Sequence, residues 1–324
     1  MTEKDWQPQA TLDVLQRRAE LLQQIRDFFA RRDVLEVDTP VLSRAANTDP
    51  NIDSFVIDYA GPDSPVSGQL YLHTSPEFAM KRLLAAGSGP IYQLCKVFRD
   101  GEAGRMHNPE FTLLEWYRPG FDHHALMDEV EELLNQLLGI NVAFRRITYQ
   151  QAFIDTTGID PLTTSVEQCR AYSIRSGPGD VTGLGENLDA WLDLLMDQVV
   201  VPTLGNTPVF IFDYPASQAA LARLSANDSR VAERFELFIS GVELANGFHE
   251  LTDAGEQRQR FLSDNAQREQ DDKPGYPIDE NLLQALEHGL PDCAGVALGI
   301  ERLLMLLTGK NYISDVLAFP ISRA

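Results

Sequence analysis

Three groups of residues have types and spacings that suit chemistry on a nucleotide. The first lies in a polar loop between two apolar runs, where Arg99 and His107 are followed by Phe111. A guanidinium can form a two-pronged contact with a phosphate, and an aromatic ring offers a flat face to a base. A surface hairpin with a solvated charged loop explains this stretch equally well, so both interpretations stay open at this point.

The second group is a pair of glutamates, Glu236 and Glu243, on either side of Ser240-Gly241. If Ser240-Gly241 is a two-residue hairpin turn, the two carboxylates are diagonal neighbours on one face, roughly 7–8 Å apart. They would repel each other unless a cation lay between them, and Mg²⁺ bound through carboxylates and phosphates meets that need. Solvated acids on an exposed sheet face are the alternative.

The third group centres on Arg302, in the first turn of an apolar helix that follows a strand containing Gly295 and Gly299. The helix dipole disfavours a cation at this end of a helix. An anion bound in front of the helix would explain the arginine. A surface arginine is the alternative.

The elements that would position these groups follow from apolar spacing. Residues 92–98 and 111–117 are predicted to form an antiparallel strand pair, and a second hairpin is predicted over 234–251. Residues 208–224 predict a strand, a turn and a helix. Ser75 is expected to cap a helix that has Pro76 in its first turn. Further helices are predicted over 12–32, 78–86, 125–138, 148–153 and 188–200.

Composition narrows the class of protein. The chain has 324 residues, 44% of them hydrophobic, and a formal net charge of -21, which argues against general nucleic-acid coating but not against a local basic groove. Its three cysteines, Cys95, Cys169 and Cys293, fit neither a disulfide framework nor a zinc pattern. The segment MTEKDWQPQ has no signal pattern and no apolar run could span a bilayer. We therefore expect a soluble cytoplasmic protein with no membrane partner.

The three groups described above, in their order along the chain, resemble the catalytic core of the class II aminoacyl-tRNA synthetases. Pro40, at the end of the helix and strand of 12–42, is similar to the first signature motif, FRDGEAGRMHNPEF to the second and GVALGIERLL to the third. TSPE, HNPEFTLLEWY, ELANGFHEL and LGIERL are similar to the lysine branch. The resemblance implies an α+β fold with an antiparallel sheet flanked by helices. It implies one catalytic domain, 1–324, with a helical insertion at 122–205, and a homodimer.

The position of the first motif in the chain distinguishes between two kinds of lysine-type enzyme. Lysyl-tRNA synthetases have an anticodon-binding barrel of about 100 residues before it, whereas the predicted helix here begins at Leu12. We therefore expect a core similar to the ligases that activate lysine or (R)-β-lysine with ATP and attach it to a lysine side chain of elongation factor P, without tRNA. A minimal lysyl-tRNA synthetase and a catalytically inert paralogue are the alternatives.

The resemblance also implies a role for each candidate residue. Arg99 and Arg302 would be catalytic, binding the α- and γ-phosphates of ATP, while Phe111 would stack on adenine. Glu236 and Glu243 would hold Mg²⁺. Other expected ATP contacts are Asp100, Gly101, Glu102, His107, Asn108, Leu244 and Gly299. The expected amino-acid contacts are Ser75, Pro76, Glu77 at the substrate amine, Asn246 at its carboxylate, and Glu115, Tyr117 and Glu250 around its terminal ammonium.

Two positions depart from the family pattern. Gly101 stands where the second motif commonly has an acid that contacts adenine, so that contact would pass to Glu102 after a loop shift. Ala297 stands where lysyl-tRNA synthetases usually have glycine. The extra methyl near the amino-acid pocket could change which lysine isomer fits.

Overall fold

The computed structural model describes residues 6–324, so the first five residues of the segment without a signal pattern lie outside the described part. The described chain divides into two compact units. The first comprises the chain up to Gly120 together with Glu132–Ile140 and Thr252–Ala324, and the second comprises Phe121–Glu131 and Asn141–Leu251. Helix α3 (His123–Leu138) therefore begins in the second unit and ends in the first.

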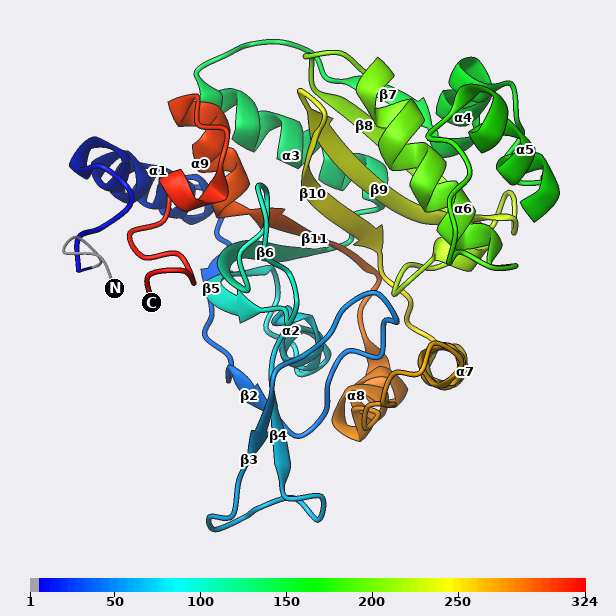
Figure 1. The fold of residues 1–324 in the computed structure, drawn as a ribbon. Coiled ribbons are helices and arrows are strands. Elements are labelled where there is room, and N and C mark those ends of the chain that lie inside the picture. The colour runs from blue at the N-terminus through cyan, green and yellow to red at the C-terminus, as the bar shows by residue number, and fades with distance from the viewer. Residues whose placement is uncertain (1–5) are drawn as a thin grey trace. The chain divides into compact units, whose positions relative to one another are not determined.

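The first unit is built on four neighbouring strands (Figure 1). In spatial order they are β1 (Leu35–Glu36), β5 (Ile91–Phe98), β6 (Glu110–Pro119) and β11 (Cys293–Gly299). β5 and β6 are antiparallel with Val97 opposite Phe111, and β6 and β11 are also antiparallel. The short β1 runs parallel to β5. The predicted pair over 92–98 and 111–117 is therefore confirmed, and the sheet here is antiparallel except at its β1 edge.

Helix α1 (Leu12–Ala30) covers this sheet with an apolar stripe, as the predicted helix over 12–32 required. Phe28 and Phe29 are fully buried, and the Phe29 ring stacks on Tyr92 with centroids 4.4 Å apart. Helix α9 (Ile300–Thr308), which follows β11 directly, contacts both α1 and β6. This packing fixes the start of α9, the place where Arg302 lies.

A smaller sheet of the first unit leads into the TSPE segment. It contains β2 (Leu42–Ser43), β4 (Gln69–Leu72) and β3 (Val56–Asp58), in that order, and is followed by α2 (Glu77–Ala85). Pro76, not Ser75, occupies the N-cap position, because Pro76 has a ψ of 0° and lies outside the helix. Ser75 still caps in effect, since its Oγ accepts a hydrogen bond from the Glu77 N–H at 3.0 Å.

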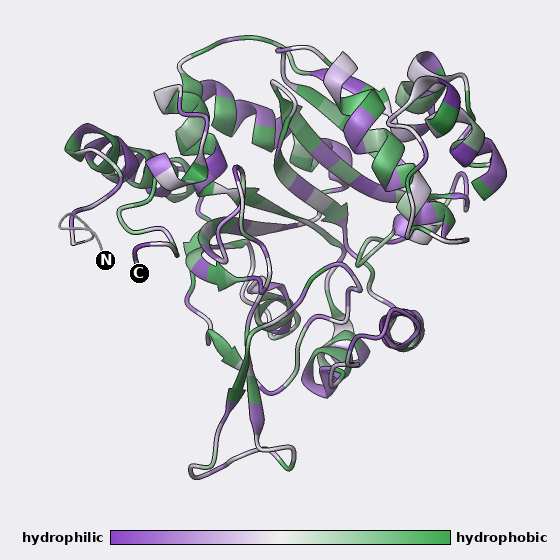
Figure 2. Ribbon diagram, viewed as in Figure 1, coloured by the Kyte–Doolittle hydropathy of each residue, from purple (hydrophilic) through white to green (hydrophobic). Residues whose placement is uncertain are grey.

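Two further helices of this unit are α7 (Ala254–Gln270) and α8 (Glu280–Gly289). α7 is mainly hydrophilic (Figure 2), and its buried face includes Arg268, which is fully buried. Arg268 donates hydrogen bonds to the Asp49 carbonyl at 3.0 Å and to Asp53 Oδ1 at 2.7 Å, and lies over the Tyr276 ring. A buried guanidinium needs such partners to offset its desolvation, so this residue fixes the segment around Asp53.

The second unit contains four neighbouring strands in the order β10 (Val242–His249), β9 (Val231–Ile239), β8 (Val209–Pro215) and β7 (Arg145–Thr148). β9 and β10 form the predicted hairpin, with Ile239 opposite Val242. The turn residues Ser240 and Gly241 both have positive φ, 52° and 74°. Positive φ at both positions is the requirement of the two-residue hairpin turn that matches strand twist.

Helices α4 (Tyr149–Thr157), α5 (Val166–Ser176) and α6 (Leu188–Leu195) lie together beside this sheet (Figure 1), and a π-helical turn, Met196–Val200, follows α6. Their apolar faces share one core cluster around Tyr149, Phe153 and Trp191. The helices predicted over 125–138, 148–153 and 188–200 are confirmed. β7 was not predicted, because its four residues, RRIT, lack alternating hydrophobicity.

The helix predicted after Pro215 is wrong. Only a three-residue 3₁₀ turn, Ala216–Gln218, forms there. The following residues pair with strands instead: the Arg223 N–H donates to the His249 carbonyl, and Ala222 and Leu224 form isolated β-bridges. Long-range backbone hydrogen bonds outweigh the helix propensity of this alanine-rich segment, since propensity is a weak preference that tertiary context overrides.

The composition led to expectations about the cysteines and about membrane-spanning segments. Cys95, Cys169 and Cys293 are free thiols, as predicted. Across residues 6–324 there is no helix whose length and apolar character would let it cross a membrane.

Candidate functional site

Arg99 follows the last residue of β5 and lies against the returning strand. Its guanidinium carbon is 5.1 Å from the Phe111 ring centroid, and its Nη1 is 3.7 Å from Glu102 Oε1. In the described part of the chain, the buried Arg99 Nε has no hydrogen-bond partner. A buried donor without an acceptor is costly, so this guanidinium is suited to receiving an anion beside an aromatic face.

The loop that follows Arg99 is held at several points. The Asp100 N–H donates to the Asp53 carbonyl at 2.8 Å, which links the loop to the segment fixed by Arg268. Gly101 has a φ of 79°, a conformation that favours glycine over the acid common at this position. At the loop exit, the buried Asn108 donates to the Glu110 carbonyl at 2.6 Å and accepts from the Ile321 N–H at 3.0 Å.

Arg302 contacts the same loop. Its Nη2 lies 2.8 Å from His107 Nε2, and it is the third residue of α9. Gly299 caps this helix, and a Cβ built there would lie 3.9 Å from the Arg302 side chain. The loop after β5 and the start of α9 therefore bring two of the predicted ATP contacts together.

Glu301, which sequence reasoning missed, positions Arg302. Its carboxylate is buried and accepts a hydrogen bond from the Thr112 N–H at 2.8 Å, with Arg18 Nη2 at 3.4 Å from its other oxygen. This anchors the first turn of α9 to β6. The available signal was an acid beside Arg302 in an otherwise apolar helix.

Four predicted amino-acid contacts form one cluster in the first unit. Ser75 Oγ donates to one oxygen of Glu115 and the Tyr117 hydroxyl donates to the other, both at 2.7 Å. Only 2% of Glu115 is exposed. Burial, and next the negative charge of Glu77, raise the pKa of Glu115 to about 7, while the two hydrogen bonds and Lys81 oppose the rise. Glu115 is thus a buried acid poised near neutrality.

Lys81 is a second residue that sequence reasoning missed. Its ammonium lies 2.7 Å from Glu77 Oε1 one turn earlier in α2, and the lysine is almost fully buried. Glu77 therefore has a cation partner within its own helix. The signal was the Glu-to-Lys spacing of four residues, which pairs side chains on one helix face.

The strands on either side of Glu115 carry two further residues. Gln93 on β5 and Ala297 on β11 are both directly opposite Glu115 in the sheet register. Directly opposite residues of antiparallel strands have Cβ atoms about 4.5–5.5 Å apart. The methyl group of Ala297, which a glycine at this position would lack, therefore lies beside the buried Glu115.

The second unit contains the predicted metal-binding pair. Glu236 lies on β9 with 14% of its side chain exposed. Desolvation raises its pKa, the charge of Arg234 opposes that rise, and the charge of Glu243 adds to it. Arg234, two residues away on the same strand face, hydrogen-bonds Glu236. The sequence prediction missed this internal partner. Arg234 also lies over the Tyr214 ring at 4.5 Å.

The strand opposite, β10, carries the other predicted contacts of this unit. Asn246 pairs with Glu236 in register, and its Oδ1 is buried without a hydrogen-bond partner within the described chain. A register shift falls between Glu243 and Ala245, so Leu244 is the extra residue of a β-bulge. Such bulges are common next to active sites. Glu250, just after β10, is fully buried, and its backbone bridges to Ala222.

These residues fit a divalent cation that prefers oxygen ligands. Two carboxylates lie within electrostatic reach of each other, and an amide oxygen without a partner faces the same strand position. Mg²⁺ takes carboxylates together with substrate phosphates. Arg234 neutralises part of the Glu236 charge.

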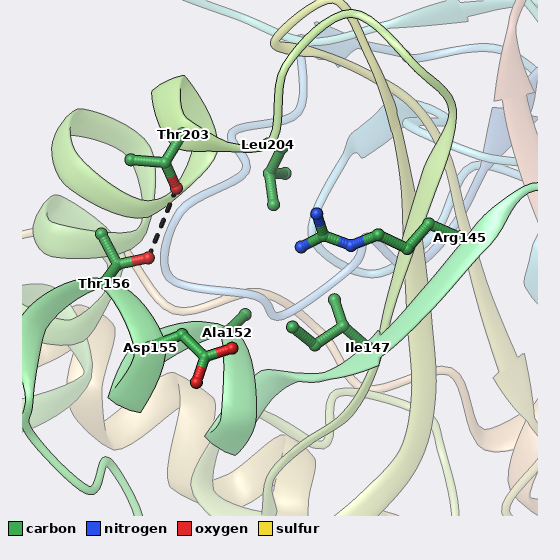
Figure 3. A pocket seen from close by; sticks show the side chains of 7 residues that line it. All are labelled: Arg145, Ile147, Ala152, Asp155, Thr156, Thr203 and Leu204. Atoms are coloured by element: carbon green, nitrogen blue, oxygen red, sulfur yellow. Dashed lines mark hydrogen bonds between the residues drawn. The ribbon is translucent and has the colours of Figure 1, made fainter.

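A separate hollow of about 360 Å³ lies in the second unit (Figure 3). Arg145 projects into it from β7, and Asp155 and Thr156 border it from α4. Its other lining residues are Ile147, Ala152, Thr203 and Leu204. None of the residues predicted to bind ATP or amino acid lines this hollow.

Comparison with known proteins identifies the family. A family model described as class II tRNA synthetases (D, K and N) matches residues 5–323. The chain belongs to this family. The resemblance drawn from the three motifs is thereby confirmed, and so is the fold class of a class II synthetase domain with a sheet flanked by helices.

Several class II relatives are similar over nearly the whole chain. A Vibrio atlanticus protein is 52% identical over 320 residues, 98% of this chain and 99% of its own. A Vibrio cholerae protein is 52% identical over the full length of both chains. A Pseudoalteromonas translucida protein is 52% identical over 98% of each. All three are named elongation factor P–(R)-β-lysine ligase.

Proposed function

We propose that this protein is a ligase that activates (R)-β-lysine, or lysine, with ATP and transfers it to a lysine side chain of elongation factor P. The observation that carries the proposal is the 52% identity, over 98–100% of the chain, to relatives named for that reaction. A buried acid with two hydroxyl donors, Glu115, supports a substrate with a terminal ammonium. A cytoplasmic location and a homodimer are part of the proposal.

For the first unit, the proposed roles concern ATP and the cationic end of the amino acid. Arg99 would bind the α-phosphate and Phe111 would stack on adenine, and the buried Nε of Arg99 supports an anion there. Arg302, held by His107 and by the anchored α9 turn, would bind the γ-phosphate. Expected ATP contacts also include Asp100, Gly101, Glu102, Asn108 and Gly299.

Glu115, Ser75 and Tyr117 would bind the terminal ammonium of the substrate. A bound ammonium favours the ionised form of a neighbouring carboxyl. Substrate binding would therefore lower the pKa of Glu115 from about 7 and release a proton. Glu77 would take the other amine, sharing its charge with Lys81. Ala297, opposite Glu115, would restrict which lysine isomer fits.

For the second unit, Glu243 and Glu236 would hold Mg²⁺, which neutralises phosphate charge when bound. Leu244 would contact ATP through its backbone, and Asn246 would donate its side-chain amide to the substrate carboxylate. Glu250 would contribute negative charge that favours a cationic substrate. Within the described chain the buried Oδ1 of Asn246 has no hydrogen-bond partner, so it can accept from a donor or ligate a cation, while the side-chain N–H groups would serve the carboxylate.

The proposed reaction needs no side-chain nucleophile. A substrate carboxylate oxygen attacks the α-phosphorus of ATP and pyrophosphate leaves, giving the aminoacyl-adenylate. The amine of the acceptor lysine then attacks the activated carbonyl, and AMP leaves with the bond electrons. The protein contributes alignment and preorganised positive charge.

The proposal can be tested in two assays. Radiolabelled pyrophosphate should exchange into ATP in the presence of (R)-β-lysine or lysine, and intact-mass analysis should show one amino acid added to elongation factor P. Acceptor variants with the modified lysine changed to arginine should stay unmodified. Absence of exchange with every lysine isomer would leave an inert paralogue as the explanation.

The same assays separate the ligase from a minimal lysyl-tRNA synthetase. We expect no tRNA partner, so lysine tRNA incubated with enzyme, ATP and amino acid should stay uncharged. Charging of tRNA without modification of elongation factor P would refute the proposed acceptor while retaining the activation step.

A further inference from the structure

A cluster of imidazoles and acids lies in the second unit among residues to which the proposed reaction gives no role. His123 is the first residue of α3, Glu233 lies on β9 and His249 ends β10. His249 Nδ1 is 2.5 Å from Glu233 Oε2, and His123 Nδ1 is 4.0 Å from the same oxygen. One ligand atom from each of the three residues lies within 4.8 Å of the others.

The cluster is separate from the candidate magnesium residues. Successive side chains of a strand point to opposite faces, so Glu233 lies on the face of β9 opposite to Arg234 and Glu236. On β10, Phe248 pairs with Arg234, which places His249 on the same face as Glu233. Two distinct groups of polar side chains therefore occupy the two faces of one hairpin.

The two histidines of this cluster are almost fully shielded from solvent. Only 5% of His123 and 6% of His249 are exposed. Among the described residues, neither ring nitrogen of His123 has a hydrogen-bond partner. A buried imidazole normally satisfies both nitrogens, because an unsatisfied buried donor or acceptor costs about 1–3 kcal/mol. Within residues 6–324, the structure therefore has a buried imidazole that makes no hydrogen bond but lies close to acidic side chains.

A fourth residue, Asp213, lies on the far side of the His123 ring. Its Oδ1 is 3.5 Å from His123 Nε2. It occupies the register shift between Phe212 and Tyr214 in β8 and has a φ of 58°. Bulges of this kind redirect a side chain, and here the carboxylate is directed at the imidazole.

We propose that His123, His249 and Glu233 form a Zn²⁺ site that joins the start of α3 to the β9–β10 hairpin. Two imidazoles and a carboxylate are the ligand types that Zn²⁺ prefers, with bonds of about 2.0–2.2 Å. Ligand atoms of a tetrahedral site with such bonds lie about 3.3 Å apart. The observed separations of 2.5 and 4.0 Å bracket this value, so small side-chain rotations suffice.

Asp213 completes the arrangement as an orienting residue. When His123 binds the metal through Nδ1, its Nε2–H is directed at Asp213. This is the carboxylate–histidine–zinc arrangement in which the outer acid fixes the tautomer and ring orientation. Water would fill the fourth position. The ligand set disfavours Mg²⁺, which selects oxygen ligands.

The test uses untagged, full-length protein stripped with a chelator and dialysed. Zinc titrated against a chromophoric competitor should bind one ion per chain and raise the melting temperature. Co²⁺ in place of zinc should give visible d–d absorption of tetrahedral intensity. His249→Ala and Glu233→Gln should each lose at least about tenfold in zinc affinity and lose the cobalt spectrum, and Asp213→Asn should weaken binding by about 10–100-fold.

His288→Ala supplies the matched control, because His288 is an exposed histidine at the end of α8. It should bind zinc as the wild type does. Circular dichroism of each variant checks folding, and Glu233→Gln keeps side-chain size if an alanine variant fails to fold. Wild-type protein that takes up no zinc, or unchanged affinity in His249→Ala and Glu233→Gln, would overturn the proposal.

Discussion

Each compact unit has a glutamate that is largely shielded from solvent, and the two carboxylates have different hydrogen-bond partners. Glu115 in the first unit accepts hydrogen bonds from two neutral hydroxyls, those of Ser75 and Tyr117. Glu236 in the second unit is hydrogen-bonded by the guanidinium of Arg234. A buried carboxylate bonded to a cation is a compensated charge, whereas one held by hydroxyls can still accept a cation from outside. This difference fits the proposed role of Glu115 in recognising a cationic substrate.

The largest expected effect on stability comes from removing the guanidinium of Arg234. Arg234→Leu should destabilise the protein by about 3 kcal/mol, the low end of the range for breaking a buried pair, because Glu236, with 14% of its side chain exposed, loses its cation partner. Chemical denaturation would measure the loss. Arg234→Leu/Glu236→Leu should recover much of it, since the lone charge is gone. Arg230→Leu, at an exposed ion pair of the same segment, should cost little. An equally small loss in Arg234→Leu would end the contrast between the two glutamates.

Glu115 should make stability depend on pH in the opposite sense to an acid whose pKa is lowered in the folded state, such as Asp53. Its pKa in the folded state, about 7, is above the ordinary 4.5, so the folded protein binds more protons between these values. The contribution of Glu115 to the free energy of unfolding is fully present below pH 4.5. It falls by roughly 3 kcal/mol as the pH rises through 7.

Glu115→Gln removes this dependence. The free energy of unfolding of the variant minus that of the wild type should therefore increase between about pH 4.5 and about pH 7 and level off at higher pH. Saturating lysine should reduce the difference, because a bound ammonium compensates the charge. A difference that stays flat with pH would show that Glu115 ionises as an ordinary acid.

The same substitution should also impair substrate selection. Loss of a buried, hydrogen-bonded charge partner costs about 2 kcal/mol or more, which corresponds to about 30-fold in kcat/KM for the cationic amino acid. The KM for ATP should change little. Pyrophosphate exchange at varied lysine and ATP concentrations separates the two. An equal rise in both KM values would indicate general damage to the fold.

The smallest effect concerns the methyl opposite Glu115. Ala297→Gly should change the ratio of kcat/KM between lysine isomers by about tenfold, as expected for one methyl in a tight pocket. Ala294→Gly, on the same strand but opposite Arg118, is the matched control and should keep the ratio. The same ratio in both variants would exclude Ala297 from isomer selection.

Much of the fold could be predicted from sequence because local patterns specify it. The strand pair around Arg99 and the Ser240-Gly241 hairpin follow from alternating residues and turn chemistry, and α1 follows from its apolar stripe. The helix predicted after Pro215 failed because its backbone pairs with strands distant in sequence. That pairing leaves no local signal.

The sequence did not predict which side chains pair with the candidate site residues. The sequence indicated Glu77, Glu236 and Arg302 as candidate residues, yet the structure supplies Lys81, Arg234 and Glu301 as the side chains that pair with or position them. Lys81 and Arg234 are close in sequence to the acids they pair with, but periodicity alone does not say which charges become buried. Burial turns an ordinary neighbouring charge into a determinant of the site.

The bulge at Leu244 changes which side chains of β10 lie on the side of Glu236. With strict alternation, Glu243 and Asn246, three positions apart, would project to opposite sides of the hairpin. The extra residue brings both to the side of Glu236 and leaves the Leu244 peptide groups outside the ladder with β9. Exchanging Leu244 for another buried aliphatic residue would preserve those peptide groups. Deleting it would remove them, so an insertion–deletion screen can detect a contribution that substitution scanning would miss.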